Sequence, residues 1–116
     1  MTALAHIGRS VDKQLITAII KAGRGKKMLK LFGESPRVLS ISHHHARGAG
    51  RQRIRTGQLF STEMDILMML VETEFADALF AAVFEAAEIG QPGGGMIFVE
   101  SVIRGHPMLP FDGADW

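Results

Sequence analysis

The chain passes from a predicted helix into a predicted strand within the stretch Ile89-Gly90-Gln91-Pro92-Gly93-Gly94-Gly95-Met96-Ile97-Phe98-Val99. Glycine accepts backbone angles that other residues resist, and it leaves no side chain over the amide groups. Successive N–H groups in such a turn form a concave site that suits an anion. The turn can therefore hold a phosphate group, or it can simply connect the helix to the strand.

Hydrophobic patterns on both sides of this turn predict two similar halves. The expected strands are short apolar runs rich in β-branched residues, at 15–20, 38–43, 65–71 and 96–103. The expected helices carry apolar residues at helical spacing, at 26–32 and 74–88. In the second strand, Leu39, Ile41 and His43 are expected on one face, with Val38, Ser40 and Ser42 on the other.

The order strand, helix, strand, loop, strand, helix, strand predicts an α+β domain of the ferredoxin-like, split βαβ type. Its sheet is antiparallel, and both helices lie on one face. The continuous apolar run at 66–71 indicates burial on both faces of the sheet. Because no further helix is available, another subunit is the simplest cover for the second face.

Composition narrows the class of protein. Hydrophobic residues make up 47% of the 116 residues, which excludes a disordered chain, and the length favours one domain. No apolar run reaches the length of a membrane span, so we expect a cytoplasmic protein without membrane insertion. The absence of cysteine excludes disulfides and thiolate metal sites. Catalysis has little support, because no nucleophilic cysteine and no G-x-S-x-G elbow is present, and we expect no enzyme.

Hydrophobic periodicity disappears from 46 to 62, which predicts a long loop. A loop of this length is usually functional or disordered. It contains four arginines, Arg47, Arg51, Arg53 and Arg55. Guanidinium groups suit phosphate and carboxylate, so the cluster either contacts an anion or partner or is simply solvated. Nucleic acid is not expected, because base stacking needs aromatic side chains and only Phe60 is near.

Three consecutive histidines end the second predicted strand. His43 and His45 would share a face of that strand and could meet one metal ion. Zinc needs further ligands, and the other reading is a polar strand end that enters the loop.

Four segments resemble the P-II signalling proteins, the nitrogen-regulatory family. Ala18-Ile19-Ile20-Lys21 resembles the first strand of that family, and Gly48-Ala49-Gly50-Arg51-Gln52 resembles the motif that opens its T-loop. Residues 75–88 resemble its second helix, and residues 90–99 resemble its B-loop pattern. The resemblance implies a P-II-like domain at 14–104, with a T-loop-like segment at 47–63 and a B-loop-like segment at 89–96. An N-terminal extension (1–13) and a C-terminal tail (105–116) flank this domain.

The resemblance also implies a homotrimer with an adenine nucleotide (AMP, ADP or ATP) bound between subunits as an effector. The nucleotide-binding residues implied are Ser42, Gly90, Gln91, Gly93, Gly94, Gly95 and Arg104. A target protein (a transporter, enzyme or regulator) would be engaged through loop 48–63. The residues implied for this effector and partner loop are Arg47, Gly48, Gly50, Arg51, Gln52, Arg53 and Arg55.

The chain departs from the family pattern in ways that affect function. Gly94 and Met96 replace the aspartate and lysine of the B-loop. Loss of the lysine favours AMP or ADP over ATP. The chain contains no tyrosine, so tyrosine uridylylation cannot occur. A small-molecule-sensing, allosteric signal protein is therefore expected; the alternative is a trimeric metal-binding or structural protein, similar to the copper-tolerance trimers, that uses His43 and His45.

Overall fold

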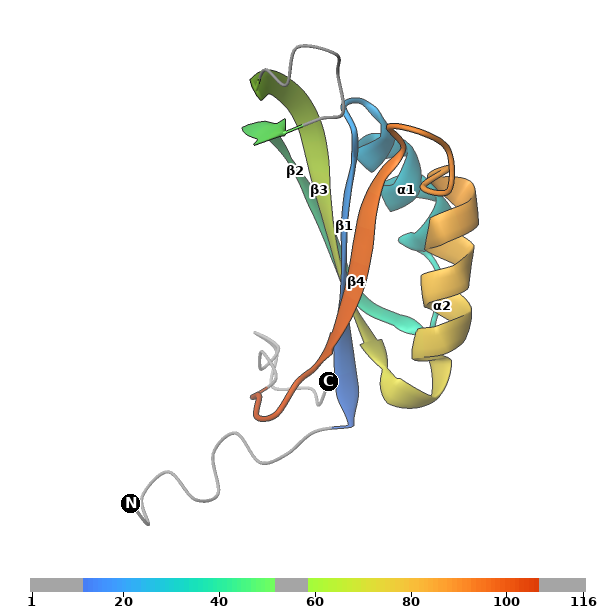
Figure 1. Ribbon diagram of the computed structural model, residues 1–116. Helices are drawn as coiled ribbons and strands as arrows, with labels where there is room; N and C mark the ends of the chain where they lie inside the picture. The colour runs from blue at the N-terminus through green and yellow to red at the C-terminus, as the bar shows by residue number, and fades with distance from the viewer. Residues whose placement is uncertain (1–11, 52–58, 107–116) are drawn as a thin grey trace, which may run out of the picture.

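The computed structural model describes residues 12–51 and 59–106; within 48–51 and 59–62 it describes the backbone. The elements are, in order, β1 (Lys13–Lys21), α1 (Arg24–Phe32), β2 (Val38–Arg51), β3 (Leu59–Glu72), α2 (Thr73–Ala86) and β4 (Gly95–Ser101). The strands form one sheet in the order β2-β3-β1-β4, and all neighbouring pairs are antiparallel. Both helices cover the same face of this sheet (Figure 1). The predicted ferredoxin-like α+β fold is confirmed.

The core lies between the helices and the sheet face that they cover. Strand side chains alternate between the two faces, and every second residue of β1 and β3 enters the core. Its main members from the strands are Ile16, Ala18, Ile20, Leu67, Met69 and Val71. Those from the helices are Met28, Ala76, Leu79 and Val83. Each large apolar side chain buried in this way contributes about 1.5–3 kcal/mol.

The opposite face of the sheet is also apolar, but neither of the two described helices covers it (Figure 1). Its rows run across three strands: Thr17 pairs with Met68 and Phe98, and Ile19 pairs with Ile66 and Met96. We call it the open face. Burial of β3 on both faces, as the sequence predicts, would require a second chain against the open face.

The predicted loop at 46–62 is wrong for most of its length. β2 continues to Arg51 and β3 begins at Leu59, and the two strands pair as far as the couple Arg51↔Leu59. Backbone pairing does not depend on an apolar face, so a hairpin that projects beyond the core can have no hydrophobic periodicity. The predicted loop residues Gln52, Arg53 and Arg55 lie outside the described residues, as do the N-terminal extension before residue 12 and the tail after residue 106.

A β-bulge changes the predicted faces of β2. The register moves from the couple Val38↔Val71 to the couple Ser40↔Leu70, which leaves Leu39 as the extra residue. Val38 therefore packs against the core together with Ile41, although a regular strand would place them on opposite faces. His43 stays on the helix-covered face with Ile41, as predicted.

Two further observations concern the helices. α2 ends at Ala86 rather than at Glu88, because Glu88 has a left-handed backbone with φ 56 and begins a turn. Neither helix in the described part of the chain has the length and apolar character needed to cross a bilayer.

Candidate functional site

The chain reverses between α2 and β4 through a segment that we call the glycine turn (residues 87–95). Backbone hydrogen bonds close it: the amide of Gln91 donates to the carbonyl of Glu88 at 3.2 Å, and the amide of Gly94 donates to the carbonyl of Gln91 at 2.8 Å. Within the described residues, no acceptor is found for the amides of Gly90 and Gly93. Two N–H groups of the turn are therefore available to an outside anion.

Two of its glycines are required by the close packing of backbone. A Cβ at Gly94 would collide with the carbonyl of Glu88, and a Cβ at Gly95 would collide with the carbonyl of Ile19 on β1. Gly93 is different. Its φ of 71 favours glycine or asparagine, but a Cβ there would point into open space. The aspartate that the family carries at the position of Gly94 could not fit this backbone.

A guanidinium group from the first helix holds the start of the glycine turn. Arg24 Nη1 donates to the carbonyl oxygen of Ala87 at 3.3 Å, and Nη2 lies 2.6 Å from Glu88 Oε2. The hydrogen bond and the charge of Arg24 lower the pKa of Glu88, and the nearby charges of Lys27 and Lys21 act in the same direction. Three cations thus lie close enough to the turn to affect the ionisation of a carboxylate there.

The base of the β2–β3 hairpin carries a second set of charges. Arg47 Nη2 donates to Glu63 Oε1 at 2.8 Å, across the couple Arg47↔Glu63. The hydrogen bond and the charge of Arg47 lower the pKa of Glu63, and His45 contributes further. His45 Nε2 lies 3.6 Å from the other carboxylate oxygen of Glu63.

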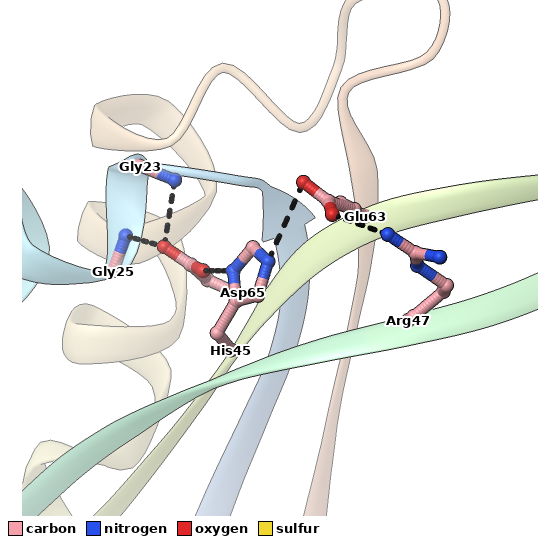
Figure 2. A network of polar contacts seen from close by, with 6 residues as sticks. All are labelled: Gly23, Gly25, His45, Arg47, Glu63 and Asp65. Atoms are coloured by element: carbon pink, nitrogen blue, oxygen red, sulfur yellow. Dashed lines mark hydrogen bonds and ion pairs between the residues drawn. The ribbon is translucent and has the colours of Figure 1, made fainter.

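A buried aspartate joins the hairpin base to the first helix (Figure 2). Asp65 is 3% exposed. Its Oδ2 accepts hydrogen bonds from the amides of Gly23 at 2.9 Å and Gly25 at 2.8 Å, and its Oδ1 accepts one from His45 Nδ1 at 3.0 Å. Burial raises the pKa of Asp65, but the hydrogen bonds from His45, Gly25 and Gly23 outweigh it, so the pKa lies below the usual value.

Asp65, Glu63 and Arg24 were not predicted as functional, whereas His45 was a candidate metal ligand and Arg47 belonged to the predicted effector and partner loop. Asp65 appears in the sequence as the first residue of an apolar strand, and Arg24 lies just before the first predicted helix. The available signal is the spacing of Asp65, which is in phase with the buried Leu67, Met69 and Val71. An acid at a core position of a strand needs donors, and Gly23 and Gly25 supply them.

Residues 13–104 match the model of the family described as nitrogen regulatory protein P-II. The chain belongs to the P-II family. It is 32% identical over 92 residues to the nitrogen fixation nifHD1 region GlnB-like protein 1 of Methanosarcina barkeri. The matched region covers 77% of this chain and 87% of that protein. P-II proteins are regulatory signal proteins.

Solved P-II structures share the fold of this chain. The complex of B. subtilis GlnK with ATP has a TM-score of 0.62 at 19% identity, over 78% of this chain and 81% of that chain. Arabidopsis thaliana PII bound to citrate has a TM-score of 0.60 at 17% identity, over 79% of this chain and 78% of that chain.

This P-II subunit gathers two of the predicted site segments at one end of its sheet. Gly95 is paired with Ile20 and Met64 with Lys21, so the glycine turn and the hairpin base both lie at the end where β1 finishes. Gly48, Gly50 and Arg51 continue the hairpin within β2 beyond this end.

Two predicted residues lie elsewhere in the P-II subunit. Ser42 is exposed on the open face, opposite Met68. Arg104 follows the far end of β4, separated from the glycine turn by about 20 Å of strand. A single subunit therefore does not bring Ser42 or Arg104 to the turn.

The histidines have surroundings that differ from a metal site. His45 already donates its Nδ1 proton to Asp65. His43 Nδ1 is buried and has no hydrogen-bond partner among the described residues, and its ring packs on Gly25, where a Cβ would lie 2.8 Å from this nitrogen. Among residues 12–51 and 59–106, no three histidine or acidic side chains are placed to hold a metal ion.

Proposed function

We propose that this P-II family protein is a homotrimeric sensor that binds an adenine nucleotide between subunits and regulates a partner protein through segment 48–63 of the β2–β3 hairpin. The observation that carries the proposal is the glycine turn, which has two amides without an acceptor in the described part of the chain and lies at the same end of the sheet as the hairpin base. A ligand at the turn would therefore be near the segment that signals.

The chemistry of the glycine turn supports a phosphate ligand. The amides of Gly90 and Gly93 have no acceptor in the described part of the chain, and the space beside Gly93 is open, since a Cβ there would meet no atom within 4 Å. Arg24 adds a guanidinium group, which suits phosphate oxygens. B. subtilis GlnK, which shares the fold, binds ATP.

The residues of the turn favour AMP or ADP over ATP. Met96 stands where the family has a lysine, and its side chain is 54% exposed on the open face. Glu88, also exposed, adds a carboxylate that would repel the outer phosphates. A missing charge-assisted contact weakens binding by about ten- to a hundred-fold, so ATP should lose the advantage that its third phosphate would otherwise provide.

The open face supports assembly into a trimer. Its side chains include Met68, Met96 and Phe98, which are 37%, 54% and 39% exposed in one subunit. A contiguous apolar surface of this kind usually marks a contact with another chain. Ser42 and Arg104, which are far from the glycine turn of their own subunit, would then be available to the turn of a neighbour.

Calorimetry with matched variants of Gly93 tests the nucleotide site. Asparagine and aspartate both tolerate the left-handed backbone of this residue, and a Cβ there meets no other atom within 4 Å. Only aspartate places a negative charge beside the phosphates. We expect Gly93→Asp to weaken ADP binding by about ten-fold or more, while Gly93→Asn binds within about three-fold of the wild type. Equal affinities of the two variants, or negligible binding of AMP, ADP and ATP by the wild type, would contradict the site.

A further inference from the structure

Polar contacts connect the hairpin base to the first helix without a gap (Figure 2). Arg47 binds one oxygen of Glu63, and His45 lies against the other oxygen. The second nitrogen of His45 then donates to Asp65. Glu63 and His45 each contact two members of this network at once, so neither can shift without affecting both neighbours.

The same contacts continue to the glycine turn. The second oxygen of the aspartate binds the amides of Gly23 and Gly25, which flank Arg24 in the chain. Arg24 in turn holds the carbonyl of Ala87 and the carboxylate of Glu88. Segment 23–25 therefore contacts both regions. Its two glycine amides bind the carboxylate of Asp65, and its arginine side chain binds the glycine turn.

We propose that Asp65 and His45 are positioning residues that couple the glycine turn to the base of the β2–β3 hairpin. The proposal deepens the proposed function, on which it rests for the identity of the ligand that the turn receives. A phosphate that draws Arg24 away from Glu88 would move segment 23–25, and the hydrogen bonds of Asp65 would carry this movement to β2 and β3.

Asp65 is suited to this role because loss of its hydrogen bonds, either to the two amides or to His45, would destabilise the fold. A buried carboxylate that loses a donor keeps its charge in a poorly solvated place. Its two oxygens belong to one rigid planar group, so a displacement of the amides at one oxygen reorients the other. The packing is close as well: a Cβ on Gly25 would lie 2.9 Å from Asp65 Oδ2 and 2.8 Å from His43 Nδ1.

His45 joins two carboxylates that belong to different environments. Asp65 is buried, whereas the Glu63 side chain is 52% exposed. Since the ionised Asp65 can only accept, His45 Nδ1 must carry a hydrogen. The neutral ring would then present a lone pair to Glu63, and only the protonated ring attracts both acids. His45 thus links the buried aspartate to the exposed ion pair of the hairpin.

Hydrogen exchange on the nucleotide-free protein tests the coupling directly. Arg24→Gln weakens the contacts at the glycine turn, and Lys26→Gln removes an exposed cation from the same helix as the matched control. We expect Arg24→Gln to speed exchange in peptides covering 43–47 and 63–67 by about two- to five-fold, the range of a partly exposed ion pair. Lys26→Gln should leave these peptides unchanged, and peptides from the core of β1 should be unchanged in both.

Replacement of the positioning residues should cut the coupling. In an Asp65→Asn background, Arg24→Gln should no longer change exchange at 43–47 and 63–67. His45→Asn retains one donor to Asp65 and should preserve part of the effect, whereas His45→Leu should abolish it. If Asp65→Asn does not fold, the variants His45→Asn and His45→Leu still test the coupling. Both should fold, because the His45 side chain is 55% exposed. If Arg24→Gln alters exchange only near 24–28 and 86–95, or acts equally in all backgrounds, the coupling is refuted.

Addition of ADP separates this coupling from the proposed function. If ADP binds, it should change exchange at 43–47 in the wild type but not in His45→Leu, and the affinity for ADP should stay within about three-fold. If neither ADP, AMP nor ATP binds, the proposed function fails, while the result for Arg24→Gln still decides whether the turn and the hairpin are coupled. Equal responses to ADP in wild type and His45→Leu would overturn the coupling even with binding intact.

Discussion

An ionisable residue, Asp65, lies in the core of this chain. Asp65 lies in phase with Leu67 and Met69, and burial alone would destabilise its charge. Three hydrogen bonds, two from backbone amides and one from His45, satisfy it. The amides belong to the first turn of α1, where helix donors otherwise lack partners. Asp65 therefore caps a helix from a distant strand, and no local sequence pattern could reveal this.

Asp65→Asn should lower the free energy of unfolding at neutral pH by about 2 kcal/mol, because it removes a charged acceptor from buried donors. The pKa of Asp65 is lowered in the folded state. Its stabilisation is therefore complete above the unfolded pKa of about 4 and is lost as the pH falls through the lower folded value. The difference between wild type and variant should be constant from about pH 5 to 8 and should shrink below about pH 4.

Urea denaturation followed by circular dichroism, at one protein concentration, measures this difference. Asp77→Asn is the control, since Asp77 is an exposed acid on α2 and its loss should cost less than about 0.5 kcal/mol. A wild type and an Asp65→Asn variant of equal stability at pH 7 would show that the carboxylate contributes nothing to the fold.

At the scale of elements, the sequence predicts the helices and strands that show hydrophobic periodicity. The six elements follow in the predicted order because each packs an apolar face against the core. The strand structure of the hairpin arms beyond Ala46 and Met64 follows from backbone pairing, which requires no hydrophobic pattern. The bulge at Leu39 is similar, since it depends on register with β3. Long-range pairing, rather than local propensity, explains both errors.

The same reasoning applies to the site. The glycine turn could be predicted, because glycines in a helix-to-strand connection are visible in the sequence. The contribution of Arg24 could not, since Ala87 and Glu88 are more than 60 residues away from it in the chain. Partners that meet only after folding are absent from any local pattern.

The glycines of the turn should differ in how much they stabilise the protein. Gly95→Ala brings a methyl group against the carbonyl of Ile19 and keeps φ at 123, so it should lower the free energy of unfolding by about 3 kcal/mol. Gly93→Ala has only the cost of a left-handed backbone, about 1 kcal/mol, because the space around it is open. Thermal unfolding of both variants shows which substitution lowers stability more. Equal losses would indicate that β4 moves away from β1 to accept the methyl group.

At the scale of the whole molecule, one chain has an apolar sheet face that its described helices leave uncovered, and two predicted site residues that lie away from the glycine turn. The helices cover one face of the sheet, and the open face exposes apolar side chains from β3 and β4. The two candidate segments meet at one end of the sheet, whereas Ser42 and Arg104 do not join them. Packing of the open faces of several copies would bury the apolar surface and would bring the remote residues of one copy toward the turn of another.

Phe98→Glu should therefore dissociate the assembly. Phe98 is 39% exposed on the open face, so a charge there would be buried at the contact between copies, where an unpaired carboxylate is costly. Leu31→Glu is the control, because Leu31 lies on α1 and is 55% exposed, outside that contact. Light scattering at micromolar concentration should give three times the chain mass for the wild type and for Leu31→Glu, and one chain mass for Phe98→Glu. Dissociation should also weaken ADP binding, since Ser42 and Arg104 would no longer reach a neighbouring turn. A wild type that is a stable monomer, or a Phe98→Glu variant that remains a trimer, would show that the open face has another role.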